Sequence, residues 1–114
     1  LRQGMVIMVR EGTEAKDLDA LMPILKHNNN RKIIFVTDDR HPEDIYVHIN
    51  GMVQRAIESG VNPIKAIQMA SLNTAEYFKL QDLGAIAPGY RADFNVFASM
   101  DDVTKLKMVN LLNL

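Results

Sequence analysis

Ionisable side chains gather directly after one short apolar segment of this chain. The segment is Ile33–Val36, with the sequence IIFV, and residues 37–41 follow it with the sequence TDDRH. An apolar run without polar alternation is typical of a strand that is buried on both faces of a parallel sheet. Ligands of parallel α/β folds bind at the carboxyl ends of such strands. Burying two adjacent carboxylates there is costly without compensation, and a metal cation would supply that compensation.

The same pattern has a simpler interpretation. Asp38 and Asp39 belong to a residue type that caps helices well, and the sequence PED at residues 42–44 suits the solvated first turn of a helix. On this interpretation the two aspartates have a structural role. The pattern alone leaves both interpretations open.

The composition limits the classes of function that the chain can have. It has 114 residues, of which 47% are hydrophobic, which is enough for the core of one domain. Its 13 basic and 14 acidic residues give a net charge of −1, which argues against a nucleic-acid or anionic-membrane partner. Without cysteine, disulfides, thiolate metal ligands and a cysteine nucleophile are excluded. Because the chain has neither a signal-peptide pattern nor an apolar run of about 20 residues, we expect a cytoplasmic protein. The missing initiator methionine suggests a piece of a longer polypeptide.

Apolar patterns predict a strand–helix–strand unit in the first third of the chain. The unbroken apolar run Met5–Val9 predicts one strand, and Ile33–Val36 predicts the next. Between them, Lys16–Lys26 carries apolar residues at spacings of three and four, which indicates one helix face. Pro23 lies within that segment and is expected to kink or split the helix. Two strands joined through a helix in this way are expected to pair in parallel.

Further helices are predicted in the middle of the chain. An apolar stripe between residues 45 and 57 indicates one helix. Asn62 and Pro63 supply the capping residue and the first-turn proline of another. Asn73, with Glu76 three residues later, has the spacing of a capping box and predicts the start of a third, short helix.

The last third of the chain changes in character. In residues 84–97, the turn signal Pro88-Gly89 lies between two short β-like runs, which predicts a hairpin. Residues 99–114 fit either a helix or a strand.

Three segments of the chain resemble adenine deaminases of the amidohydrolase superfamily. They are residues 37–45 (TDDRHPEDI), 48–78 and 82–97 (DLGAIAPGYRADFNVF), and the resemblance runs from about Gly4 to Phe97. The first segment carries the specific likeness to adenine deaminases. The other two are similar to many members of the superfamily.

The resemblance implies an α/β fold in which this chain is a fragment of a (β/α)8 TIM barrel. Residues 1–80 would form its last two βα units with trailing helices, and residues 81–114 would form part of the small β domain and a tail. The implied reaction is the hydrolytic deamination of adenine to hypoxanthine and ammonia. The implied cofactor of the intact enzyme is a divalent metal, manganese in the first place, with iron or zinc as alternatives.

The resemblance also implies roles for individual residues. Asp38 matches the aspartate of the last barrel strand, which contacts the metal and transfers protons at the hydrolytic water. A carboxylate that stays ionised beside a metal can accept the proton of the water and then protonate the departing ammonia. Asp39, His41 and Arg10 are candidates for substrate binding. For Asp39, helix capping or orientation of its neighbours is favoured over a contact with the purine, and for Arg10 the alternative is a surface ion pair.

The chain lacks most of what the family's metal centre requires. It contains no His-x-His pair and predicts only two barrel strands, whereas a catalytic metal takes about three protein ligands. We therefore expect this piece alone to bind no metal and to be inactive, and its open strand edges to favour a homo-oligomer. Two alternatives stay open: a different amidohydrolase, dihydroorotase-like or imidazolone-hydrolysing, and a non-enzymatic oligomerisation module.

Overall fold

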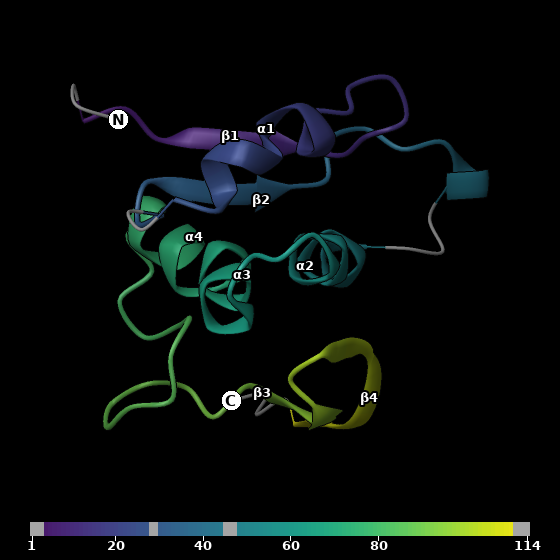
Figure 1. The fold of residues 1–114 in the computed structure, drawn as a ribbon. Helices are drawn as coiled ribbons and strands as arrows, with labels where there is room; N and C mark the ends of the chain where they lie inside the picture. Colours follow the sequence, from purple (N-terminus) through teal and green to yellow (C-terminus); the bar gives the residue numbers. More distant parts are fainter. Residues whose placement is uncertain (1–3, 28–29, 45–47, 111–114) are drawn as a thin grey trace.

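The computed structural model describes residues 4–27, 30–44 and 48–110. Two short strands and a hairpin enclose a layer of helices between them (Figure 1). In chain order the elements are β1 (Ile7–Arg10), α1 (Leu18–Leu25), β2 (Ile33–Val36), a 3-10 turn (Pro42–Asp44), α2 (Ile49–Glu58), α3 (Pro63–Ala70), α4 (Leu72–Tyr77), β3 (Phe94–Ser99) and β4 (Asp102–Asn110). Within the described ranges, no helix is long and apolar enough to cross a bilayer.

The first two strands pair in parallel, as the sequence predicts. The register runs from Ile7 opposite Ile33 to Arg10 opposite Val36. β2 has the predicted bounds, whereas β1 begins two residues later than predicted. Both strands therefore end at the same edge of the sheet, at the right in Figure 1.

The proline in α1 does not split the helix. α1 runs through Pro23 over eight residues and buries Leu18, Met22 and Leu25. It is shorter at both ends than the predicted segment Lys16–Lys26. Pro23 itself is exposed, so its ring points away from the apolar face.

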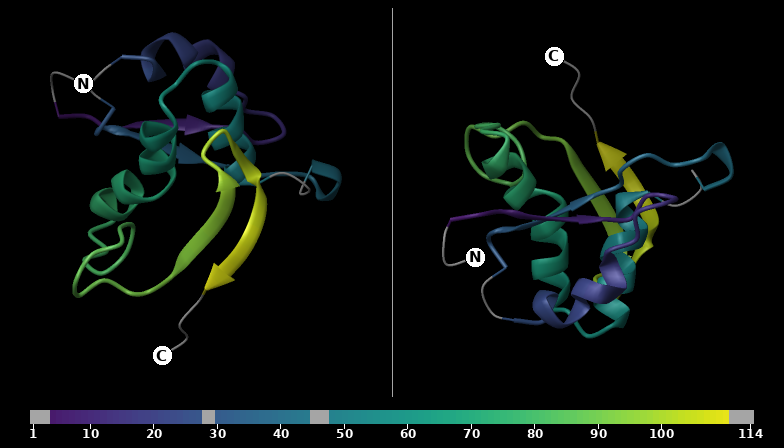
Figure 2. Two further views of the ribbon diagram at one scale, coloured as in Figure 1. Left: turned by 60° about the horizontal axis from the view of Figure 1, so that its bottom comes forward. Right: turned by 90° about the horizontal axis from the view of Figure 1, so that it is seen from above.

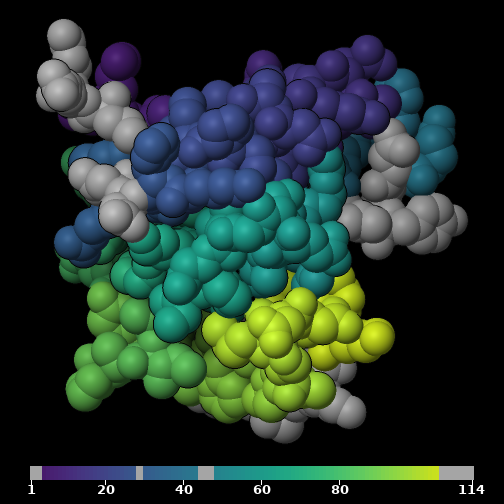
Figure 3. Space-filling model, in the orientation of Figure 1, coloured from purple at the N-terminus to yellow at the C-terminus, as the bar shows by residue number. Residues whose placement is uncertain are grey.

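The helices α2, α3 and α4 lie between the parallel sheet and the β3–β4 hairpin (Figure 1). The predicted capping of α3 is confirmed, because the Asn62 side chain accepts hydrogen bonds from the backbone N–H groups of Ile64 (3.0 Å) and Lys65 (3.4 Å). One apolar cluster joins the layers, and it includes Val9 of β1, Met52 of α2 and Val103 of β4. In the space-filling view the hairpin contacts the helices directly (Figure 3).

The predicted capping role of Asn73 is wrong. Ser71 occupies the N-cap position of α4, and Asn73 lies inside the helix, buried. Its side-chain amide donates to the backbone carbonyls of Asn30 (2.8 Å) and Ile33 (2.9 Å), at the start of β2. Asn30 is itself buried and donates from its side chain to the carbonyl of Leu25 at the end of α1 (2.7 Å). The buried side chains of these two asparagines therefore connect α1, β2 and α4 by hydrogen bonds.

The predicted hairpin within residues 84–97 is also wrong. The Pro88-Gly89 turn forms, closed by a hydrogen bond from the Tyr90 N–H to the Ala87 carbonyl (3.1 Å), but strands do not flank it on both sides. The chain instead packs on α4 at Gly84, where φ is +92° and an added Cβ would lie 2.9 Å from the Cα of Leu72. A backbone held this close to a helix has no room to form the first strand of a hairpin.

The hairpin forms later in the chain. β3 pairs antiparallel with β4 from Phe94 opposite Asn110 to Ser99 opposite Asp102 (Figure 2). Residues 102–110 are therefore strand, and the helix alternative for this segment is wrong. The remaining residues of the ambiguous tail, 111–114, lie outside the described residues.

The described residues do not form a closed barrel. They contain one parallel and one antiparallel pair of strands, each a separate two-stranded sheet. Residues on both sides of the predicted boundary at residue 80 are in contact, since the Gln54 side chain bonds the backbone of Asp101 (3.0 Å) and Val103 (2.9 Å). The division into residues 1–80 and 81–114 stays a prediction.

We expect Asn73→Ala to lower the free energy of unfolding by about 2 kcal/mol, because it removes two buried hydrogen bonds. The Asn30 carbonyl keeps the N–H of Ile33 as a donor (3.0 Å), whereas the Ile33 carbonyl loses the donor that Asn73 supplies. Glu76→Ala is the matched control on the same helix, since Glu76 is exposed and its ion pair with Arg31 is long (3.7 Å). We expect the control to change stability by less than about 0.5 kcal/mol. Urea unfolding of both variants measures the difference, and equal effects would contradict a role for the Asn73 amide.

Candidate functional site

The segments that follow β1 and β2 lie side by side at the carboxyl edge of the parallel sheet. The hydrogen bonds that join them include, with the donor named first, Glu11 N–H to Val36 O (3.1 Å), Thr13 N–H to Asp39 O (3.0 Å) and His41 N–H to Thr13 Oγ1 (2.9 Å). We call residues 10–13 and 37–41 together the strand-end site. All four of the predicted site residues fall within it.

Asp38 is held in an unusual backbone conformation. Its φ is +62°, in the left-handed region that few residues other than glycine adopt. Such a conformation costs on the order of 1 kcal/mol for a non-glycine residue, and residues of this kind cluster at functional sites. One carboxylate oxygen accepts the N–H of Asp39 (2.9 Å), and the other lies 3.4 Å from Nη1 of Arg10. The side chain is 36% exposed, so it remains accessible to a ligand.

Arg10 interacts more closely with Asp17 than with Asp38. Its Nε donates to Asp17 Oδ2 at 2.8 Å, and this hydrogen bond and the charge of Asp17 are the main causes that raise the pKa of Arg10. Asp38 contributes less to the same rise. The guanidinium thus stays charged and forms a bridge between the loop before α1 and Asp38. Its predicted role in substrate binding stays a prediction.

Asp39 and His41 are both exposed, and neither begins a helix at the strand-end site. The helix-capping role of Asp39 is wrong, because α2 begins only at Ile49 and its N-cap residue is His48. The His41 ring is 3.9 Å from Glu43, with Nδ1 toward Oε1. Both residues follow Asp38 within three positions of the chain, and substrate binding by their side chains stays a prediction.

A half-buried ion pair connects the strand-end site to α2, and the sequence did not predict it. Glu11, only 14% exposed, accepts from Arg55 of α2 at 2.6 Å, and Arg55 also bonds Asp19 of α1 at 2.6 Å. Burial lowers the pKa of Arg55, but the hydrogen bonds and charges of both acids outweigh this effect and raise it. The backbone carbonyl of Glu11 accepts from the guanidinium of Arg40. The sequence shows each charge but not which helix brings its partner.

The strand-end site has three carboxylates, but they are not arranged as a metal site in the part of the chain that the structure describes. Among the described residues, no group of three or more histidine, aspartate or glutamate side chains is placed to hold an ion. The Asp38 carboxylate is a suitable hard oxygen ligand for a divalent cation. Its neighbour Arg10 is positively charged and is not a metal ligand. Any complete ligand set therefore needs residues beyond the described ones.

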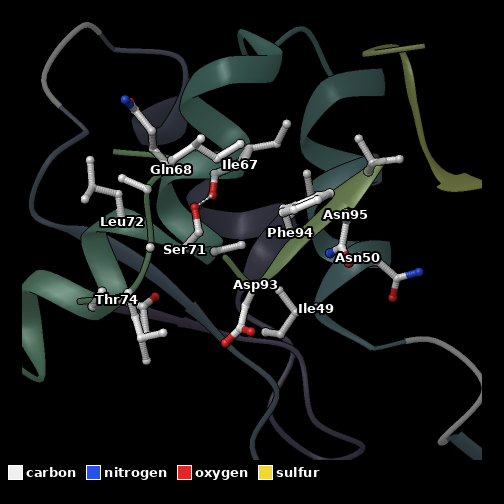
Figure 4. Close-up of a pocket in the computed structure, with 18 of the residues that line it drawn as sticks. Ile49, Asn50, Ile67, Gln68, Ser71, Leu72, Thr74, Asp93, Phe94 and Asn95 are labelled. Carbon is white, nitrogen blue, oxygen red and sulfur yellow. Dashed lines mark hydrogen bonds between the residues drawn. The ribbon is translucent and has the colours of Figure 1, made fainter. Parts of the chain in front are cut away.

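One cavity of the described structure lies elsewhere. An open, mainly apolar cavity of about 830 Å³ separates α2, α3 and α4 from residues 83–103, and Figure 4 shows its lining. Asp93, Asn50 and Ser71 are among its few polar groups, and the Ser71 hydroxyl is already bonded to the Ile67 carbonyl (2.7 Å). No residue of the strand-end site lines this cavity. The candidate chemistry and this cavity are thus formed by different residues.

Comparison with known proteins gives a consistent result. The sequence profile described as "Amidohydrolase family" matches residues 4–113. The chain is 56% identical over 104 residues to an adenine deaminase of Desulfatibacillum aliphaticivorans and 49% identical over 104 residues to one of Thermosipho africanus, each covering 90% of this chain and 18% of the relative. An adenine deaminase of Clostridium acetobutylicum is 48% identical over 111 residues, which are 96% of this chain and 19% of the relative. The resemblance to adenine deaminases is therefore confirmed, and the chain spans about a fifth of the length of these curated relatives.

We expect Arg55→Met to lower the free energy of unfolding by about 1–2 kcal/mol, because the half-buried Glu11 carboxylate loses its charged donor. Adding Glu11→Gln to Arg55→Met should recover part of the loss, since the uncompensated charge is then gone. Arg31→Met is the matched control, because the Arg31 ion pair is exposed. Thermal and urea unfolding measure all three variants, and a double variant no more stable than Arg55→Met would contradict this account.

Proposed function

Because this chain belongs to the amidohydrolase family, we propose that the intact protein, meaning this chain with the rest of the polypeptide that its relatives possess, is an adenine deaminase. The reaction is the hydrolysis of adenine to hypoxanthine and ammonia. The observation that carries the proposal is the identity of 45–56% to curated adenine deaminases over about 90% of the chain. The placement of Asp38 after a buried parallel strand supports it.

The proposed place of the chain in the intact fold is the end of a (β/α)8 barrel. β1 and β2 would be its strands seven and eight, and the β3–β4 hairpin would belong to the small β domain. Two observations support this placement: the strands are parallel and joined through a helix, and the residues with candidate chemistry follow their carboxyl ends. The outer edges of the pair would continue into the other barrel strands.

Asp38 is the proposed proton-transfer group. It would accept the proton of the water that attacks the ring carbon bearing the amino group, and then protonate the amine as its bond to carbon breaks and ammonia leaves. Asp38 would also be one ligand of a divalent metal, manganese or else iron or zinc, whose other ligands lie outside the described residues. When bound, such a metal makes water a nucleophile near neutral pH. The 36% exposure of the Asp38 carboxylate keeps it available for both roles.

Arg10, Asp39 and His41 are the proposed substrate-binding residues of this chain. Arg10 lies 3.4 Å from the Asp38 carboxylate, and Asp39 and His41 follow Asp38 in the same loop. The three offer a charged donor, an acceptor and a group that can act as either. The edge of a purine presents both donors and acceptors, so this set matches it in kind. A catalytic metal takes about three protein ligands, and no such group is placed together among the described residues, so the 114-residue chain alone would not turn over adenine.

We expect Asp38→Asn in the intact protein, with Mn²⁺ supplied, to lower kcat for adenine about 100-fold or more, since positioned acid–base catalysis contributes about that factor. Asparagine keeps the shape of the side chain and tolerates the same backbone region, so folding should be preserved. Asp82→Asn, at an exposed position far from the strand-end site, is the matched control. Hypoxanthine formation is followed by chromatography, with the 114-residue chain as a blank that should give none. Full activity of Asp38→Asn would contradict the assignment, and no turnover by the unaltered protein would contradict adenine as substrate.

Self-association of the 114-residue chain on its own is part of the proposal. Apolar surface lies beside a strand edge that is unpaired within the described residues. It comes from Met5, which precedes β1 and is 64% exposed, and from Met8, which lies in β1 and is 38% exposed. Edges of this kind pair readily with another copy. We expect light scattering of the 114-residue chain to give a mass above one copy that falls when Met8 is changed to Lys. A monodisperse monomer would contradict this expectation.

A further inference from the structure

We infer that Thr13 is a positioning residue that fixes the backbone of residues 38–41 and thereby the direction of the Asp38 carboxylate. This inference rests on the proposed function and deepens it, because it assigns a role to the loop after β1 in the chemistry of the strand that follows. The contacts of Thr13 on which the inference rests are with the main chain of Asp39 and His41. Its effect would be transmitted through the main chain.

Thr13 bonds the chain on both sides of Arg40. Its backbone N–H donates to the carbonyl of Asp39 (3.0 Å), and its hydroxyl oxygen accepts the N–H of His41 (2.9 Å). The first bond is to Asp39, the residue after Asp38, and the second is to His41, two residues further along the chain. Two bonds to alternate residues fix both the position and the direction of a loop segment, as one bond would not.

Gly12 brings the two segments close enough for these bonds. A Cβ on Gly12 would lie 2.7 Å from the carbonyl oxygen of Asp39, 3.1 Å from the Cβ of Asp38 and 3.2 Å from the carbonyl oxygen of Thr37. A side chain at this position would push the loop away, so the contact depends on glycine. Arg40 closes the same contact from the other side by donating to the Glu11 carbonyl.

The conformation of Asp38 explains why the loop must be held. At φ +62°, a non-glycine residue has relaxed alternatives at negative φ that would turn its side chain to another direction. Such a conformation persists only where surrounding contacts determine it. The bonds to Thr13 and the approach of Gly12 are among those contacts, together with the Asp39 N–H that the Asp38 carboxylate accepts (2.9 Å). A carboxylate that must meet a water and a leaving group in turn loses efficiency when it is misplaced by about 1 Å.

The test compares Thr13→Val with Thr13→Ser in the intact protein. Valine keeps the shape of threonine and removes the hydroxyl acceptor, whereas serine keeps the acceptor. Thr104→Val is the control, because it removes a threonine hydroxyl in β4, outside the strand-end site, where the hydroxyl donates to the Asp102 carboxylate (2.6 Å). Two readouts are needed: hydrogen–deuterium exchange of a peptide covering residues 37–41, and kcat and KM for adenine with Mn²⁺ supplied.

We expect Thr13→Val to speed exchange in residues 37–41 about fivefold, the loss of roughly one hydrogen bond. We expect it to lower kcat about tenfold or more with KM nearly unchanged, since orientation rather than affinity is lost. Thr13→Ser should restore both values, and Thr104→Val should alter neither.

The outcomes separate the inference from the proposed function. Unchanged exchange in Thr13→Val overturns the inference, whatever the activity. Faster exchange with an unchanged kcat overturns it as well, because the loop would then be held without consequence for Asp38. Faster exchange in an intact protein that does not turn over adenine supports the hold on the loop and overturns the proposed function.

Discussion

The parallel pairing of β1 with β2 is the constraint on which the strand-end site depends. Because both strands run in the same direction, the pairing of Arg10 with Val36 brings the next residues of each strand to one edge. Glu11 can then donate its N–H to Val36 O, and Thr13 can reach the loop beyond it. An antiparallel pair would place the two segments at opposite ends of the sheet. The helices matter to the site chiefly because they hold this pair together.

Much of this frame could be predicted from local sequence. The run Ile33–Val36 is apolar on both faces and became a buried strand, and the helical spacing after it gave α2. Asn62 caps α3 because its capping depends only on neighbouring residues. The grouping of Arg10, Asp38, Asp39 and His41 followed from the direction of the strands, which sequence order and a connecting helix suffice to predict.

What could not be predicted depends on partners far apart in the chain. Asn73 resembled a cap because capping is its commonest local use, yet its amide bonds backbone 40 or more residues away. Glu11 and Arg55 are 44 residues apart, and only the folded chain, which places α2 beside the residue after β1, reveals their pairing. The hairpin was misplaced because a proline–glycine turn was taken to join strands, while Gly84 holds that part of the chain against α4. The close approach of Gly12 to Asp39 has no local signal at all.

The left-handed backbone of Asp38 also restricts which residues this position can accept. Glycine adopts a φ of +62° freely, and asparagine and aspartate do so at moderate cost, whereas branched and bulky residues do so at high cost. Of these three tolerated residues, aspartate alone carries a charge at neutral pH. The backbone conformation therefore restricts this position to three residue types, and a need for acid–base chemistry then leaves aspartate. A glutamate would carry the same charge, but it adopts this left-handed backbone conformation less readily than aspartate.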